Sequence, residues 1–301
     1  MANFFIALKN KKTITVLFGI GLAVLFLANI LSIFFTFPNI DEGYIGEWCY
    51  RLWNEGLVRC YIIEDLGLKA GNQIFGYHKL YTIMGSVIVG IFGLNLYALR
   101  IFSTFFLVLF IFLLYRFISN RIGKTEGNYF FFTSLFLLLG NTFIADQGLI
   151  ARPELTVMFF GFASYFFLVK SFENKSYAVW LSGMFAGLAA FSHLNGIVFI
   201  LAGGLVLLLK TKNIKEPLKF SVPIFVILFF YFWDINSKEK LDLFIYQWTN
   251  EPNLVIMNNS FFMRLVNEQQ RYFHNLAIIP LSIGCIVSIL FVRKKISQQF
   301  P

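Results

Sequence analysis

Charged side chains are scarce in this chain of 301 residues: Asp, Glu, Lys and Arg together make up 14% of it. Soluble domains carry about 25% charged residues. Hydrophobic residues reach 58%, and the mean hydropathy is +0.71. The composition therefore excludes a pair of ordinary soluble domains. It predicts a single all-α transmembrane helical bundle over residues 1–301.

Cysteine is nearly absent, and so are the motifs that bind nucleotides or metals. The chain has three cysteines and no G-x-x-x-x-G-K-[ST], H-E-x-x-H or C-x-x-C motif. These absences remove the support for ATP-driven transport and zinc hydrolysis, so we expect no metal and no cofactor. Cys49 and Cys60 lie in one predicted outer loop, where they either form a disulfide or remain two separate thiols.

The net charge of +9 comes from 25 basic and 16 acidic residues. A basic chain can bind nucleic acid. Here, however, the basic residues form short clusters between apolar runs, as the positive-inside rule expects for a membrane protein. We therefore expect the lipid bilayer as a partner and no nucleic acid.

Nine apolar segments follow one another along the chain. They cover approximately residues 14–37, 76–93, 97–115, 128–145, 154–170, 178–191, 196–209, 218–233 and 274–292. The first segment exceeds the roughly 7–15 apolar residues of a signal peptide and has no small-residue cleavage site. We expect it to be a retained first helix with a cytoplasmic N-terminus.

The side of the membrane on which each basic cluster falls decides how many of these segments span the bilayer. Basic residues cluster around positions 116–124, 170–175, 210–219 and 293–295. If every segment spans, the first three clusters lie on the outer side, against the positive-inside rule. If the glycine-rich segment 76–93 is interfacial or re-entrant instead, all four clusters are cytoplasmic. We therefore expect eight spanning helices and one segment at the outer surface.

The outer face then holds two long loops, 38–96 and 234–273, and two short ones, 146–153 and 192–195. All three histidines of the chain lie in or next to these loops. The cytoplasmic loops offer mostly Lys and Arg with Ser, Asn and Gly. We therefore expect the function on the outer face.

Asp41 and Glu42 directly follow the first predicted helix. Two adjacent carboxylates at the mouth of a membrane cavity suit general-base catalysis, because scarce water raises the pKa of a carboxylate. Alternatively, the pair belongs to a solvated helix N-terminus, in which Asp41 is the N-cap and Glu42 lies in the first turn.

Three further polar groups lie at predicted membrane boundaries. Arg152 and Glu154 are either functional or a local ion pair. His193 lies in a polar break between two short helices and is either a structural residue or part of a site. The aromatic residues of loop 234–273 suit an interfacial belt, and Arg271 beside them suits a phosphate contact.

The order of several short motifs resembles one family of membrane enzymes. After the Asp41-Glu42 pair come Tyr77-His78-Lys79-Leu80-Tyr81, Phe92-Gly93, Ala98-Leu99-Arg100, Ala151-Arg152-Pro153-Glu154, Ser182-Gly183…Gly187-Leu188-Ala189 and Ser192-His193-Leu194-Asn195-Gly196. Over about residues 10–210, this order resembles the GT-C membrane glycosyltransferases. Within them it is similar to the protein O-mannosyltransferases and the lipid A aminoarabinose transferases.

The resemblance implies a GT-C fold and an inverting glycosyltransferase with its active site at the outer face of a bacterial inner membrane. The donor would be a sugar on polyprenyl phosphate, and the acceptor a hydroxyl of a glycan, lipid or protein. Asp41 matches the catalytic base of the family, Glu42 its polar neighbour, and Lys79 or His78 the basic residue that contacts the lipid phosphate. The other expected substrate-binding residues are Tyr44, Arg152, Glu154, His193 and Arg271.

Two other functions are compatible with the sequence. A transporter of lipid-linked sugars would place polar residues at mid-membrane depth and show inverted halves. The polar residues here gather on one face, and no repeat is visible. A non-catalytic membrane subunit would keep the helices without needing Asp41, so a transfer assay on Asp41→Asn separates it from the enzyme.

Overall fold

The computed structural model describes residues 11–62, 69–75, 78–122, 124–140, 149–173 and 175–250. This part of the chain consists of helices and connecting segments without strands, which confirms the all-α prediction for it. Contacts divide the chain into two compact units, Met1–Trp248 and Thr249–Pro301. The helices described below belong to the first unit, apart from the last residue of α11.

Four of the described helices are long and apolar enough to cross a membrane. They contain the candidate spans Val16–Phe35 in α2 (Lys11–Phe35), Leu96–Arg121 in α5 (Leu96–Ile122), Glu154–Ser171 as α7, and Leu194–Thr211, which includes α9 (Ile197–Thr211). A chain with several such helices is membrane-embedded, because about 17–25 apolar residues are needed to span a bilayer.

The predicted number of eight spanning helices is not confirmed. Helices α6 (Lys124–Leu139), α8 (Ser176–Ser192) and α10 (Lys215–Phe229) have 16, 17 and 15 residues. These lengths lie at or below the lower limit of about 17 residues for a spanning helix. The eighth predicted span, 274–292, lies outside the described residues.

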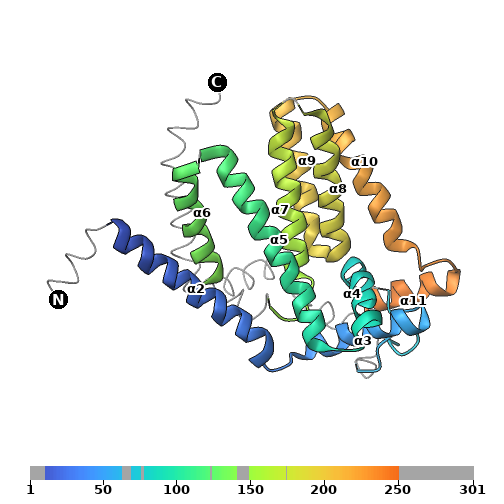
Figure 1. Cartoon of the computed structure of the whole chain (residues 1–301). Coiled ribbons are helices and arrows are strands. Elements are labelled where there is room, and N and C mark those ends of the chain that lie inside the picture. Colours follow the sequence, from blue (N-terminus) through green and yellow to red (C-terminus); the bar gives the residue numbers. More distant parts are fainter. Residues whose placement is uncertain are drawn as a thin grey trace. The chain divides into compact units, whose positions relative to one another are not determined.

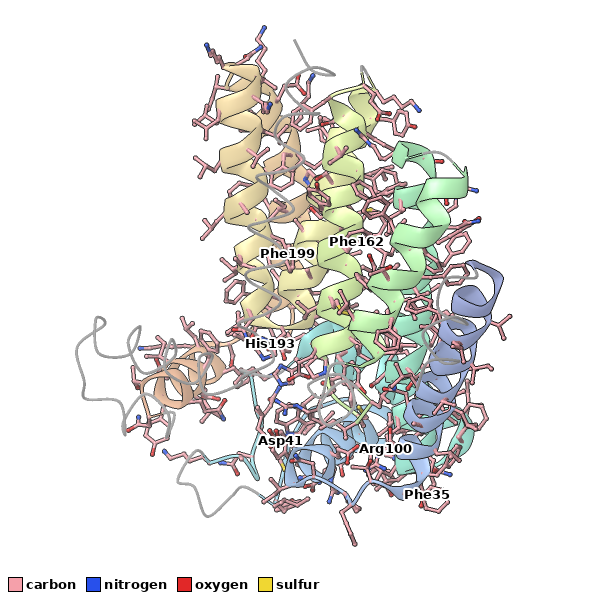
Figure 2. The ribbon with its side chains drawn as sticks, turned by 90° about the vertical axis from the view of Figure 1, so that its left-hand side faces the viewer. Phe35, Asp41, Arg100, Phe162, His193 and Phe199 are labelled. Atoms are coloured by element: carbon pink, nitrogen blue, oxygen red, sulfur yellow. The ribbon has the colours of Figure 1, made fainter. Side chains whose placement is uncertain are left out.

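Close helix packing at glycines holds the bundle together. A Cβ at Gly183 of α8 would lie 2.0 Å from the backbone oxygen of Phe220 in α10. A Cβ at Gly161 of α7 would lie 2.2 Å from the ring of Phe199 in α9. Figure 2 labels Phe199 on α9 and Phe162, the residue after Gly161, on α7. Small residues of this kind let helix backbones approach in a membrane, where lipid gives no hydrophobic drive for association.

Two shorter helices, α3 (Ile40–Glu55) and α4 (Lys79–Phe92), pack along each other at one end of the bundle (Figure 1). A Cβ at Gly85 of α4 would lie 2.7 Å from the Cys49 sulfur, and one at Gly90 would lie 2.3 Å from the Trp53 ring. Helix α4 has 14 residues, fewer than a span needs. The interfacial or re-entrant placement of segment 76–93 stays a prediction.

The two described cysteines are separate thiols. Cys49 is fully buried against α4, whereas the Cys60 thiol donates a hydrogen bond to Oε2 of Glu47 at 3.1 Å. They form no disulfide, so the second of the two sequence alternatives holds.

The predicted outer loop 234–273 contains a helix that the sequence reading missed, α11 (Lys238–Thr249). Gln247 of α11 accepts a hydrogen bond from the Phe75 amide at 3.1 Å and donates one to the Gln73 carbonyl. The Lys69 ammonium lies 4.5 Å from the centroid of the Tyr246 ring. Helix α11 therefore packs against the segment that leads into α4.

Candidate active site

Polar side chains from four segments meet at the end of the bundle where α3 and α4 lie. The segments are the N-termini of α3 and α4, residues 149–153 before α7, and the 3₁₀ helix η3 (Leu194–Gly196) between α8 and α9. Figure 2 shows Asp41, Arg100 and His193 at this end. Among the residues expected from the sequence, Arg271 lies outside the described part of the chain.

Helix α3 begins with a capping box centred on Asn39. The Asn39 side chain accepts a hydrogen bond from the Asp41 amide at 3.0 Å, and Glu42 accepts one from the Asn39 amide at 2.9 Å. This exchange satisfies two of the amide groups that a helix N-terminus leaves unpaired. The sequence alternative is therefore correct in placing Glu42 in the first turn, but wrong in making Asp41 the N-cap and the helix start solvated, since Asn39 is the cap and Glu42 is 2% exposed.

Glu42 forms a buried ion pair with Arg100 of α5. Arg100 donates to both carboxylate oxygens, from Nε to Oε1 at 2.8 Å and from Nη2 to Oε2 at 2.7 Å. The Ala151 amide donates to Oε1 at 2.7 Å. Burial raises the pKa of Glu42, but the hydrogen bonds from Arg100, Ala151 and Asn39 outweigh burial and leave the pKa below its ordinary value. Glu42 therefore joins α3, α5 and the segment before α7.

Arg100 extends this connection to the end of α2. Its Nη1 donates to the backbone oxygens of Ile33 at 2.8 Å and Thr36 at 3.0 Å. Ile33 belongs to the last turn of α2 and Thr36 directly follows the helix, where no further helical amide can reach their carbonyls. The sequence reading assigned no role to Arg100. The sequence feature that could have identified Arg100 is its position as an ionisable residue at the start of a long apolar run.

Asp41, next to Glu42, faces a different environment. Its side chain keeps 25% of its exposure and lies 3.1 Å from Nη1 of Arg152. Burial raises the pKa of Tyr44, and the hydrogen bond between its hydroxyl and Asp41 raises it further. The phenol therefore stays protonated and can donate to Asp41 at neutral pH. The structure thus brings together three expected site residues, Asp41, Tyr44 and Arg152.

Glu154 adds a second carboxylate on the other side of Arg152. Its Oε1 lies 2.7 Å from Nη2 of Arg152. Its Oε2 is buried and has no hydrogen-bond partner among the described residues. Native structures rarely leave a buried acceptor unsatisfied without a reason. An acceptor of this kind can take a hydrogen bond from a water molecule or from a hydroxyl group.

Two histidines are the remaining members of the cluster. The rings of His78 and His193 stack, with centroids 4.5 Å apart and an interplanar angle of 19°. Burial lowers the pKa of His78 to about 3, with smaller effects of the neighbouring His193 and Arg152. Burial, and then the charge on Arg152, also lowers the pKa of His193. Both rings are therefore neutral at pH 7 and contribute hydrogen-bonding groups to the cluster.

The charge of Lys79 is paired inside the protein. Its side chain is fully buried, forms an ion pair with Asp234, and lies 4.7 Å from the ring centroid of Tyr231. The sequence reading expected Lys79 at a lipid phosphate and did not foresee Asp234. The signal for Asp234 was a lone carboxylate directly after the apolar run 218–233.

No group of three or more His, Cys, Asp or Glu side chains in the described ranges is arranged to hold a metal ion.

The chain was also compared with models of protein families, with curated proteins and with solved structures. None of these comparisons gave a match. The chemistry of the cluster must therefore be argued from its own residues.

Proposed function

We propose that this chain is an inverting membrane glycosyltransferase that transfers a sugar from polyprenyl phosphate to an acceptor hydroxyl. The observation that carries the proposal is the arrangement of Asp41, Tyr44, Arg152 and Glu154 at one end of an apolar bundle. It combines a partly exposed carboxylate, a cation and a carboxylate oxygen without a partner. A reaction that removes a hydroxyl proton and expels a phosphate needs a base and a cation close together.

In this mechanism Asp41 is the general base. It takes the proton of the acceptor hydroxyl while the acceptor oxygen attacks the anomeric carbon of the donor. The bond between that carbon and the phosphate oxygen breaks, and polyprenyl phosphate leaves with inversion at the sugar. Arg152 stabilises the negative charge that develops on the leaving phosphate, because a guanidinium group can bind phosphate with two parallel hydrogen bonds.

Glu154 and the histidines have binding roles in this proposal. Oε2 of Glu154 accepts a hydrogen bond from a sugar hydroxyl, which would satisfy its unpaired lone pairs. His193 accepts a hydrogen bond from the Asn195 amide at its Nδ1, at 3.0 Å, which leaves Nε2 of the neutral ring as a donor. Neutral imidazoles orient a sugar without competing with Arg152 for the phosphate.

The proposal places the cluster at the outer face of a bacterial inner membrane. The cluster lies at the N-terminal ends of α5 and α7, whereas Arg121 and Lys170 lie in their last turns. Basic residues of short loops remain in the cytoplasm. The opposite end, which carries Asp41, then faces the outside, where polyprenyl-phosphate sugars would meet a glycan, lipid or protein acceptor.

The test is transfer of labelled sugar by membranes that contain the full chain. A panel of polyprenyl-phosphate hexoses and pentoses serves as donors, and label is followed into glycan, lipid and protein fractions. We expect Asp41→Asn to reduce turnover by about 10²–10⁴-fold, the usual contribution of general acid–base catalysis.

Asp242→Asn is the matched control, because Asp242 is an exposed carboxylate of α11. It should transfer sugar like the wild type. Near-normal turnover by Asp41→Asn would remove the mechanism. A wild-type chain that transfers no sugar from any donor would favour a non-catalytic subunit.

A further inference from the structure

A second polar site lies at the opposite end of the bundle, between the C-terminal turns of α5 and α7. A cavity of about 250 Å³ opens there. The residues that line it include Phe117, Arg121, Phe166, Lys170, Glu173 and Lys175. Pockets for complete small-molecule ligands usually have about 300–1,000 Å³. This cavity suits a single polar headgroup better than a whole ligand.

Aromatic rings hold two of the cations at this cavity. The Lys170 ammonium lies 4.3 Å from the centroid of the Phe166 ring, and the Arg121 guanidinium carbon lies 5.9 Å from that of Phe117. Both separations lie within the range of cation–π attraction, which orients a charge at little entropic expense. Two of the cations therefore lie next to the aromatic rings of the cavity.

The charge of the lining is positive. Lys170, Lys175 and Arg121 contribute three cations, whereas Glu173 contributes the one carboxylate among the residues that line the cavity. Arg121 and Glu173 form an ion pair at 2.7 Å, with side chains that keep 30% and 48% of their exposure. Exposed ion pairs contribute little free energy, so an incoming anion can take over the guanidinium group.

We propose that this cavity binds the phosphate headgroup of an anionic phospholipid of the surrounding bilayer. The cavity lies at the ends of two candidate membrane spans, Leu96–Arg121 and Glu154–Ser171. The end of a spanning helix lies near the lipid headgroups. Basic pockets between membrane helices recognise such headgroups. The Phe117 and Phe166 rings provide an apolar surface for the glycerol and the start of the acyl chains. A free phosphate ion would use the cations but gain nothing from these rings.

The experiment is a binding titration of the full chain in a neutral detergent. The three ligands are short-chain phosphatidylglycerol, short-chain phosphatidylcholine and inorganic phosphate. We expect saturable binding of phosphatidylglycerol, with an affinity about fivefold lower for each cation removed, as in Arg121→Gln and Lys170→Gln. Lys210→Gln and Lys215→Gln are controls, because they change cations of the same end that do not line the cavity.

Glu173→Gln provides an independent test, because it should change the affinity in the opposite direction. Removing the carboxylate releases Arg121 and lowers the negative charge at the cavity, so phosphatidylglycerol should bind about fivefold more tightly than to the wild type. A gain of affinity cannot come from damaged folding. Equal affinity for phosphatidylcholine, equally tight binding of inorganic phosphate, or unchanged affinity in both Arg121→Gln and Lys170→Gln would overturn the proposal.

Discussion

Glu42→Gln tests how strongly the buried ion pair holds the site end of the bundle together. Both oxygens of Glu42 accept hydrogen bonds, two from Arg100, one from the Ala151 amide and one from the Asn39 amide. Glutamine keeps the shape but replaces one acceptor oxygen with an NH₂ group. Either orientation of the amide therefore places a donor against two donors.

The expected loss is large because Arg100 stays charged and buried, with 1% of its surface exposed. Removing one partner of a buried ion pair destabilises a protein by about 3–5 kcal/mol. Arg100 retains its hydrogen bonds to the carbonyls of Ile33 and Thr36. We therefore expect a value near the lower end, about 3 kcal/mol.

The assay is unfolding of the purified chain by SDS in mixed micelles. Glu55→Gln is the control, because Glu55 also pairs with two arginines, Arg51 at 2.6 Å and Arg59 at 2.7 Å, but at the surface. Surface pairs contribute little, so this variant should unfold almost like the wild type.

A double-mutant cycle separates the pair from its parts. Glu42→Leu and Arg100→Leu each leave one buried charge without its counter-ion, whereas the double variant leaves none. The double variant should lose less stability than the sum of the two single variants. If the two losses add, or if Glu42→Gln unfolds like Glu55→Gln, Glu42 does not have the structural role argued above.

Two further predictions concern neighbouring residues. Because burial lowers the pKa of His78 from 6.5 to about 3, the unfolded chain binds a proton in this window that the folded chain does not. Stability should therefore fall from pH 7 to pH 5, and His78→Gln should flatten that fall; equal slopes would contradict the argument. Lys79→Gln removes the buried ammonium group from its ion pair with Asp234 and should lower the free energy of unfolding by about 3 kcal/mol, which a combined Lys79→Gln/Asp234→Asn variant largely restores. A single variant as stable as the wild type would show that the pair is not formed.

Much of the site could be expected from the sequence. The assignment of the loops to the two sides of the membrane predicted that Asp41, Tyr44, Arg152, Glu154 and His193 share one face. The structure brings these residues to one end of the bundle. That prediction depended on the apolar runs, whose length and charge bias are properties of the sequence alone. The same charge distribution predicted that segment 76–93 does not span the bilayer, and α4 in that segment has 14 residues, fewer than a span needs.

The roles of individual residues needed the three-dimensional structure. Asp41 and Glu42 are chemically alike neighbours, but successive residues of a helix point about 100° apart, so one is buried and the other faces the cluster. Which of the two is buried depends on α5, which brings Arg100 to Glu42 from 58 residues further along the chain.

Composition, apolar periodicity and charge bias thus determined a helical membrane protein with its polar chemistry at one end. Tertiary packing decided which charges neutralise each other. Lys79 and Asp234 are 155 residues apart, and no local pattern predicts their contact. The physical reason is that hydrophobicity acts along each segment, whereas a buried charge is stable only where packing supplies a counter-ion.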